Sequence, residues 1–214
     1  MFRGKVFSVG RVELVDPDGK PFERSIIRHP GAVHVVPVDD QRRVTLVRQY
    51  RTAADGQLLE TPAGTCDVDG EARVVTAHRE LAEEAGLSAA HMDVLIHTFN
   101  SPGISDQYTT IFLATGLSPC PTSPMGEEEG FMTIETIALD DIDALIADGA
   151  LVDETTVLGL LLARARLDAA GSAPPSASPS ASPSSPSASP SASPSSPSAS
   201  PSASSSASSA SPSS

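Results

Sequence analysis

The sequence predicts an α/β (α+β) domain, in which a mixed β-sheet lies between helical layers, followed by a low-complexity tail. Short apolar runs separated by turn signals alternate with stretches of helical spacing through about the first 170 residues. From residue 171 onward only Gly, Ser, Ala and Pro occur, in near-repeats of SASPSASPSSP. Strands interleaved with helices bury both faces of a sheet, so we expect one layered domain.

The chain begins with a predicted β-hairpin. Residues 5–15 alternate loosely between apolar and polar, Asp16-Pro17-Asp18-Gly19 is a turn sequence, and residues 21–28 form the returning strand. A lone two-stranded hairpin is marginal in water, so its apolar side needs cover from the same chain or from a second copy. The candidates on that side are Val6, Val12, Leu14, Phe22 and Ile26. We expect residues 1–28 to form a separate N-terminal unit that serves as a dimerisation element.

The rest of the folded part supplies the sheet and its helices. Residues 32–38 and 43–51 are expected to pair as strands around Asp39-Asp40-Gln41, and a short strand at 58–62 leads into a helix. Further strands are predicted at 92–98, 108–115 and 131–138, with a helix at 140–148 that ends at Gly149. Asp153 is expected to cap a last helix that runs to Leu167 and is apolar nearly all round, hence well buried. The predicted divisions are therefore the hairpin, a domain at 29–170, and a disordered tail at 171–214 with polyproline II character.

Composition narrows the classes of partner. The formal net charge of −13 lies in the folded part, whereas a general nucleic-acid binder needs a basic face. The most apolar run, at 157–162 with its flanks, is far shorter than the ~20 residues of a membrane span, and the N-terminus has no apolar signal region. Two cysteines are too few for a disulfide framework, and the five histidines lack zinc-ligand spacing. We expect a cytoplasmic protein with no nucleic-acid and no membrane partner.

A helix after residue 71 carries the predicted chemistry. Glu80, Glu83 and Glu84 are three and four residues apart, so they project from one helix face. Three adjacent carboxylates repel one another, and a divalent cation relieves that repulsion. Hard oxygen ligands of this kind suit Mg²⁺ or Mn²⁺. Arg79, one turn before Glu83, is placed to pair with it.

The same helix has an apolar face and a clear end. The residues expected to pack against the sheet are Val74, Ala77, Leu81 and Ala85. Gly86 follows the last polar turn, where a left-handed cap would end the helix. An acidic helix face in solvent is the plain alternative to a metal site, but the pattern extends well beyond the carboxylates.

The longer pattern consists of Glu71, seven intervening residues, and then Arg79-Glu80-Leu81-Ala82-Glu83-Glu84-Ala85-Gly86-Leu87. It matches the Nudix box position for position. The chain resembles Nudix hydrolases through this run. It departs from the usual pattern at Thr65, where a glycine is expected, because Gly64 lies one residue further from Glu71. The inserted residue lies outside the helix and shifts no carboxylate relative to another.

Three further runs are similar to the ADP-ribose pyrophosphatase branch of that family: VTLVRQYR at 44–51, ETPAG at 60–64 and SPGISDQYTTIFLATGL at 101–117. The usual ELPAG of the branch has Thr61 in place of leucine here. The resemblance implies a Nudix-type αβα sandwich with the box as loop–helix–loop. It also implies a homodimer that exchanges N-terminal strands.

The resemblance further implies hydrolysis of ADP-ribose to AMP and ribose 5-phosphate that depends on Mg²⁺, with Mn²⁺ as the alternative ion. The metal ligands it implies are the carbonyl of Ala63 with Glu80, Glu83, Glu84 and Glu128. The substrate contacts are Arg51, Glu60 and Ser105, and the candidate catalytic carboxylates are Glu83, Glu128 and Glu129. Glu127-Glu128-Glu129 is the one acidic run placed before the strand at 131, and which of its members acts stays open.

Plainer interpretations of these residues remain. The acidic triplet is otherwise a solvated loop, Arg51 a surface ion pair, and SPGISDQ an ordinary Pro-Gly turn. Three other functions also stay open: hydrolysis of another nucleoside diphosphate sugar or dinucleotide, a non-catalytic ADP-ribose-binding module, and an interaction protein built around the Ser/Pro tail.

Overall fold

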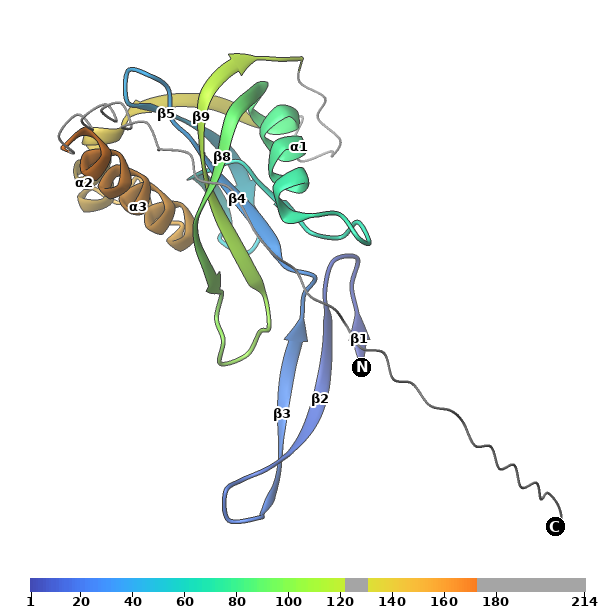
Figure 1. The fold of residues 1–214 in the computed structure, drawn as a ribbon. Coiled ribbons are helices and arrows are strands. Elements are labelled where there is room, and N and C mark those ends of the chain that lie inside the picture. The colour runs from blue at the N-terminus through green and yellow to red at the C-terminus, as the bar shows by residue number, and fades with distance from the viewer. Residues whose placement is uncertain (122–130, 173–214) are drawn as a thin grey trace, which may run out of the picture. The chain divides into compact units, whose positions relative to one another are not determined.

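The computed structural model of this chain describes residues 1–121 and 131–172 (Figure 1). The described strands are, in chain order, β1 (Phe2–Arg3), β2 (Ser8–Val15), β3 (Pro21–Arg28), β4 (Ala32–Pro37), β5 (Arg43–Arg51), β6 (Gly56–Glu60), β7 (Ala63–Thr65), β8 (Leu87–Phe99), β9 (Tyr108–Pro119) and β10 (Thr133–Ala138). The described helices are α1 (Arg73–Ala85), the short 3-10 helix η2 (Leu139–Asp141), α2 (Ile142–Ala147) and α3 (Glu154–Gly171). The tail from residue 173 lies outside the described residues, so its disorder stays a prediction.

The centre of the domain is the mixed sheet that the sequence predicts. Its strand order is β7-β4-β9-β8, with β4 parallel to β9 and the other neighbours antiparallel. A second, antiparallel sheet has the order β10-β5-β6. Helix α1 lies on one side of the central strands, and α2 and α3 lie on the other (Figure 1). The αβα sandwich is therefore confirmed.

Strand β4 joins the two halves of the core. Val33 and Val35 pack with α1, whereas Val36 packs with α3, because successive side chains of a strand point to opposite faces. All three are fully buried, and burying a valine side chain stabilises the fold by roughly 1.5–3 kcal/mol. At Gly159 of α3, an added Cβ would lie only 3.0 Å from Val36, so the helix packs closely on the sheet at this point.

The predicted pairing of the strands at 32–38 and 43–51 is wrong. β4 and β5 belong to different sheets, and only an isolated bridge joins Val38 to Val44. The connection turns sharply, since Arg42 adopts a left-handed φ of 57°. Val36 and Val38 meet Val44 and Leu46 of β5 through side chains in one core cluster, while the backbones of β4 and β5 pair with other strands. Strand β7, which was not predicted, takes one edge of β4.

The N-terminal hairpin forms as predicted between β2 and β3, from Ser8↔Arg28 to Val15↔Pro21. Its turn is held by Asp16, whose Oδ1 accepts the N–H groups of Asp18 at 3.0 Å and Lys20 at 2.8 Å. The first strand starts at Ser8 instead of residue 5, and the short β1 pairs with it. The hairpin projects from the layered body (Figure 1).

Two local signals at helix ends are confirmed. Gly86 has a left-handed φ of 63° and its N–H reaches the carbonyl of Ala82 at 3.1 Å, which ends α1. Asp153 caps α3 by accepting the N–H of Thr156 at 2.8 Å.

Two burial predictions are only partly right. Val74 at the start of α1 is 39% exposed, while Ala77, Leu81 and Ala85 are buried as expected. In α3 one face is buried, and the leucines on its other side are only half-buried. No described helix is both long and apolar enough to cross a lipid bilayer.

Candidate active site

Arg79 organises the carboxylates of α1. Its guanidinium lies 2.7 Å from Glu80, 3.2 Å from Glu83 and 3.3 Å from Glu71, so the predicted pair with Glu83 is one of three. Burial acts to lower the pKa of Arg79, but the hydrogen bond to Glu71 and the charges of Glu80 and Glu83 hold that pKa above its ordinary value. The Glu71 pKa is lowered by hydrogen bonds from Thr76 and Arg79. Arg79 therefore stays a cation and fixes the acidic face of the helix.

The loop before α1 packs directly on these carboxylates. A Cβ at Gly64 would overlap the carboxyl group of Glu80, so only glycine allows this approach. One residue earlier, the Ala63 N–H donates to Glu84 Oε2 at 2.8 Å. Glu80 and Glu84 are each 8% exposed. The predicted ligand residues Ala63, Glu80 and Glu84 are therefore brought together between β7 and α1.

The donor chemistry fits a small divalent cation. Carboxylate and carbonyl oxygens are the ligands that Mg²⁺ and Mn²⁺ prefer, and no soft ligand belongs to the predicted set. In the part of the chain that the structure describes, no group of three or more His, Cys, Asp or Glu side chains is placed to hold a metal ion. Glu80 and Glu83 instead turn to Arg79, and Glu84 turns to the Ala63 N–H. Glu127, Glu128 and Glu129 lie outside the described residues.

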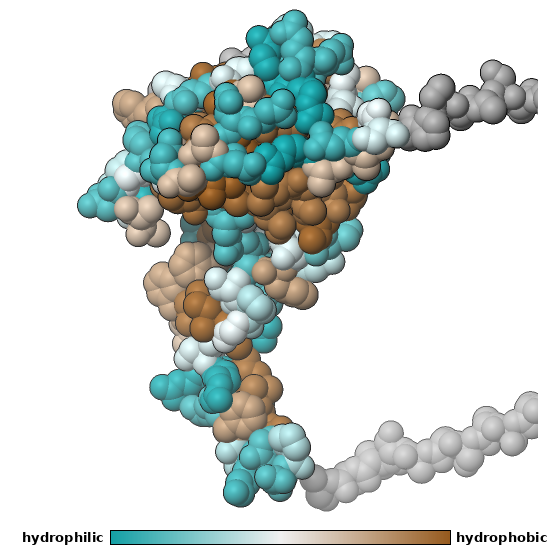
Figure 2. Space-filling model, turned by 90° about the vertical axis from the view of Figure 1, so that its left-hand side faces the viewer, coloured by the Kyte–Doolittle hydropathy of each residue, from teal (hydrophilic) through white to brown (hydrophobic). Residues whose placement is uncertain are grey.

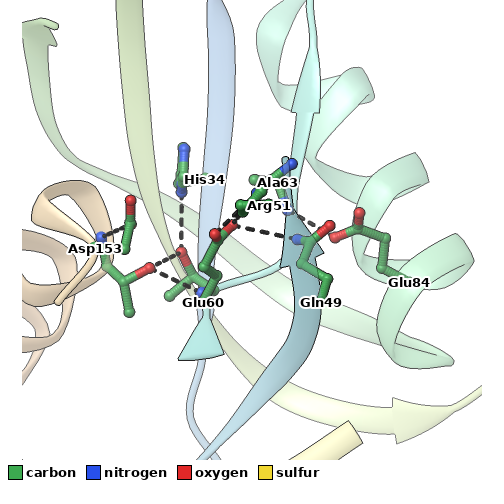
Figure 3. Close-up of polar contacts among 9 residues, drawn as sticks. His34, Gln49, Arg51, Glu60, Ala63, Glu84 and Asp153 are labelled. Carbon is green, nitrogen blue, oxygen red and sulfur yellow. Dashed lines mark hydrogen bonds and ion pairs between the residues drawn. The ribbon is translucent and has the colours of Figure 1, made fainter. Parts of the chain in front are cut away.

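Arg51 and Glu60 form a bidentate ion pair beside Ala63 (Figure 3). Arg51 Nε and Nη2 donate to the Glu60 carboxylate at 2.9 Å and 2.6 Å, and Gln49 Nε2 donates to the same carboxylate at 3.3 Å. The Glu60 side chain is 3% exposed, against 41% for Arg51. The hydrogen bond to Glu60 raises the pKa of Arg51, with Glu84 and Asp153 adding to the effect.

These two predicted substrate contacts thus contact each other. The accessible group is Arg51, and the buried Glu60 carboxylate holds it in place. Gln49 was not predicted, although it lies two residues before Arg51 and so faces the same side of β5.

A buried polar chain next to this pair was also not predicted (Figure 3). His34 Nδ1 and Thr61 Oγ1 are 3.0 Å apart, and the Thr61 N–H donates to Thr156 Oγ1 at 3.0 Å. Burial lowers the pKa of His34 to about 4, with Asp153 opposing and Arg51 adding to the shift. The imidazole is therefore neutral at pH 7. The sequence signals were weak, because His34 and Thr61 each interrupt an apolar run that otherwise predicts a strand.

Ser105 lies at a different place from these groups, at the base of the hairpin. Its Oγ accepts the Gln107 N–H at 3.1 Å, and Ile27 of β3 pairs with it through an isolated bridge. It lines a groove of about 410 Å³ together with Val12, Leu14, Ile26, Arg28, Phe99, Pro102 and Asp106. The structure therefore brings Arg51, Glu60, Ala63 and Glu84 into one site, and places Ser105 at the junction of hairpin and core.

Comparison with known proteins agrees with this geometry. The NUDIX domain family matches residues 28–156. The chain is 35% identical over 162 residues to the ADP-ribose pyrophosphatase of Mycobacterium tuberculosis (strain ATCC 25618 / H37Rv), covering 76% of this chain and 78% of the relative. It is 32% identical to the ADP-ribose pyrophosphatase of Bacillus subtilis (strain 168), covering 75% and 86%. A solved structure described as an ADP compounds hydrolase superposes with a TM-score of 0.70 at 25% identity, covering 80% of this chain and 91% of that one.

The family match over residues 28–156, on a mixed sheet between helices with an acidic helix packed on a Gly-containing loop, assigns the chain to a class of hydrolases. The chain belongs to the Nudix family and is a Nudix pyrophosphohydrolase. Members of this family act on nucleoside diphosphate derivatives and generally use divalent metal ions.

Proposed function

We propose that this enzyme hydrolyses the diphosphate bond of ADP-ribose to AMP and ribose 5-phosphate with Mg²⁺, for which Mn²⁺ is the expected substitute. The observation that carries the proposal is the contact of Glu84 Oε2 with the Ala63 N–H, which joins the box helix to the run beside Arg51. That run and Arg51 belong to the stretches that resemble ADP-ribose pyrophosphatases. The relatives of that name at 32–35% identity support the same substrate.

The residues divide into metal-holding and substrate-holding groups. Glu80, Glu83, Glu84 and the Ala63 carbonyl would hold the metal, and Glu128 is the further ligand that the sequence predicts. When bound, the cation would neutralise the charge of the diphosphate and make a bound water lose its proton more easily.

Arg51 presents the exposed part of its guanidinium to an anionic substrate group, while Glu60 fixes its direction. Ser105, by its place at the base of the hairpin, is proposed to contact a more distant part of the substrate. A carboxylate must also accept the proton of the attacking water, and Glu83, Glu128 and Glu129 are the candidates.

The deciding experiment is metal-dependent release of AMP from a panel of nucleotide sugars. We expect ADP-ribose to give the highest kcat/KM, and Glu80→Gln and Glu84→Gln to lower kcat by roughly 10²–10⁴-fold. Glu135→Gln is the matched control, because Glu135 lies on β10 and pairs with Arg48 of β5, away from the box carboxylates. Near wild-type turnover in both box variants at ordinary Mg²⁺ would disprove the metal assignment.

The panel must include GDP-mannose, because GDP-mannose pyrophosphatases are among the relatives, at 29% identity. A higher kcat/KM for GDP-mannose would keep the chemistry and change the substrate. Binding of ADP-ribose with no release of AMP would instead favour a binding module.

We also propose that the enzyme is a homodimer built through the hairpin of residues 1–28. Large apolar side chains stay exposed there, with Val6 and Phe7 at 42%, Leu14 at 39% and Val15 at 68%. In the space-filling view hydrophobic residues gather on the lower face of the body and continue down the hairpin (Figure 2). A second copy would cover this surface with one patch serving both subunits.

Light scattering at micromolar concentration tests the assembly. We expect a dimer mass, and we expect deletion of residues 1–28 to lower both dimerisation and activity. A fully active monomer would show that the hairpin packs against its own chain.

A cytoplasmic location is proposed because the thiols of Cys66 and Cys120 are both free.

A further inference from the structure

The first turn of α3 meets the segment between β6 and β7, and the contact is entirely buried. Thr61 and Thr156 are each 0% exposed. The Thr61 N–H donates to Thr156 Oγ1 at 3.0 Å, and the two hydroxyls are 3.4 Å apart. Bulk solvent does not reach this contact, and a buried backbone N–H that loses its acceptor costs about as much free energy as a lost hydrogen bond.

Residues of the proposed site lie on either side of Thr61 in the same short segment. Glu60, which holds Arg51, comes immediately before Thr61, and Ala63 comes two residues after it. The Pro62 carbonyl accepts the Val35 N–H at 2.9 Å, so β4 fixes the segment at a second point. The side chain of Thr61 contacts His34 Nδ1 at 3.0 Å and gives a third.

We propose that Thr156 is a positioning residue, whose hydroxyl holds the Thr61 peptide and so keeps Ala63 against the box helix, where the metal is proposed to bind. This inference rests on the proposed metal site. It assigns a role in that site to α3, a helix whose sequence carries no part of the box.

Asp153 supports the contact between Thr156 and Thr61 by capping α3. Its carboxylate accepts the Thr156 N–H at 2.8 Å, so the first turn of α3 is capped and the backbone of Thr156 is fixed. A hydroxyl carried by a fixed backbone limits the movement of the Thr61 peptide more than a hydroxyl on a fraying helix end would.

The test is a titration of the full-length chain with Mn²⁺, in which electron paramagnetic resonance measures the concentration of the free ion. Thr156→Val removes the acceptor with little change of shape, and Thr156→Ser keeps it. Thr155→Val is the matched control from the same turn, since the Thr155 hydroxyl bonds to Asn100 and not to the 60–63 segment. Melting temperatures in EDTA are measured for each variant.

We expect Thr156→Val to weaken Mn²⁺ binding about tenfold, the lower end of the effect of groups that orient metal ligands. Thr156→Ser should keep the wild-type affinity, and Thr155→Val should lower the melting temperature without changing the affinity. Wild-type affinity in a folded Thr156→Val protein overturns the proposal, even if that variant melts earlier.

If Thr156→Val does not fold, Thr156→Ala replaces it, because that variant also removes the hydroxyl acceptor of the Thr61 N–H and adds no new group to the buried contact. The same loss of affinity, about tenfold, is then expected, and wild-type affinity in the folded Thr156→Ala protein would overturn the proposal. Glu84→Gln separates the two levels of inference. Binding lost in Glu84→Gln but kept in Thr156→Val rejects only the role of Thr156, whereas no binding by the wild-type chain rejects the metal site and this role together.

Discussion

The Arg51–Glu60 ion pair should respond very unequally to removal of its two members. Arg51→Met leaves the Glu60 carboxylate, whose side chain is 3% exposed, with Gln49 as its side-chain donor. Breaking a buried pair in this way costs about 3–5 kcal/mol, because the remaining charge is uncompensated. Glu84 and Asp153, whose charges act on Arg51, lose a nearby cation as well. We therefore expect a loss of at least about 3 kcal/mol in the free energy of unfolding.

Glu60→Gln should be milder. The Arg51 side chain is 41% exposed, so water can solvate its guanidinium once the carboxylate has gone. The amide keeps the shape of the side chain and can still accept from Gln49. The expected loss is about 1.5–3 kcal/mol, the range for hydrogen bonds to a charged group.

Urea unfolding in EDTA, followed by circular dichroism because the chain has no tryptophan, measures both values. The double variant should lie close to Glu60→Gln, since the buried charge that makes Arg51→Met costly is then absent. Equal losses for the two single variants, or a larger loss for Glu60→Gln, would refute the view that Glu60 is the buried, dependent partner.

Three further predictions follow from particular residues. The pKa of His34 is about 4 in the folded chain and near 6.5 in the unfolded chain, so the unfolded chain binds more protons between these pH values. The free energy of unfolding should therefore fall by up to about 3 kcal/mol from pH 7 to pH 4. His34→Asn should remove that part of the pH dependence, which urea unfolding at several pH values measures. Gly64→Ala forces a Cβ into the Glu80 carboxyl group and should destabilise the fold by about 1–3 kcal/mol and lower Mg²⁺-dependent turnover, which calorimetry and AMP release measure together. Truncation after residue 172 should leave melting temperature and specific activity unchanged, as the removed residues are only Ser, Ala and Pro and offer nothing large to pack.

Features whose causes lie within a few residues were predictable from the sequence. The αL cap at Gly86, the cap at Asp153 and the hairpin turn at Asp16 each depend on one side chain or one glycine and its near neighbours. The spacing of the box carboxylates is of the same kind. A helix period alone places Glu80 and Glu84 on one face.

Features that depend on distant partners were not predictable in the same way. β4 is apolar on both faces, so its sequence is compatible with β5 as a neighbour and equally with β9, which it joins in parallel. The contacts within the site have the same character. Nothing near Arg51 in sequence specifies that its guanidinium pairs with Glu60 across the β5–β6 ladder.

Thr61 shows how a departure from a family pattern acquires a physical reason. A leucine there would fill the space with apolar surface, and His34 would then lose the hydroxyl that it contacts at 3.0 Å. A buried imidazole without a hydrogen-bond partner is costly, so the two polar residues belong together in this chain. Their contact extends to Thr156, which lies at the end of α3 nearest the site. The box helix therefore supplies the carboxylates, while the opposite helical layer fixes the segment that those carboxylates face.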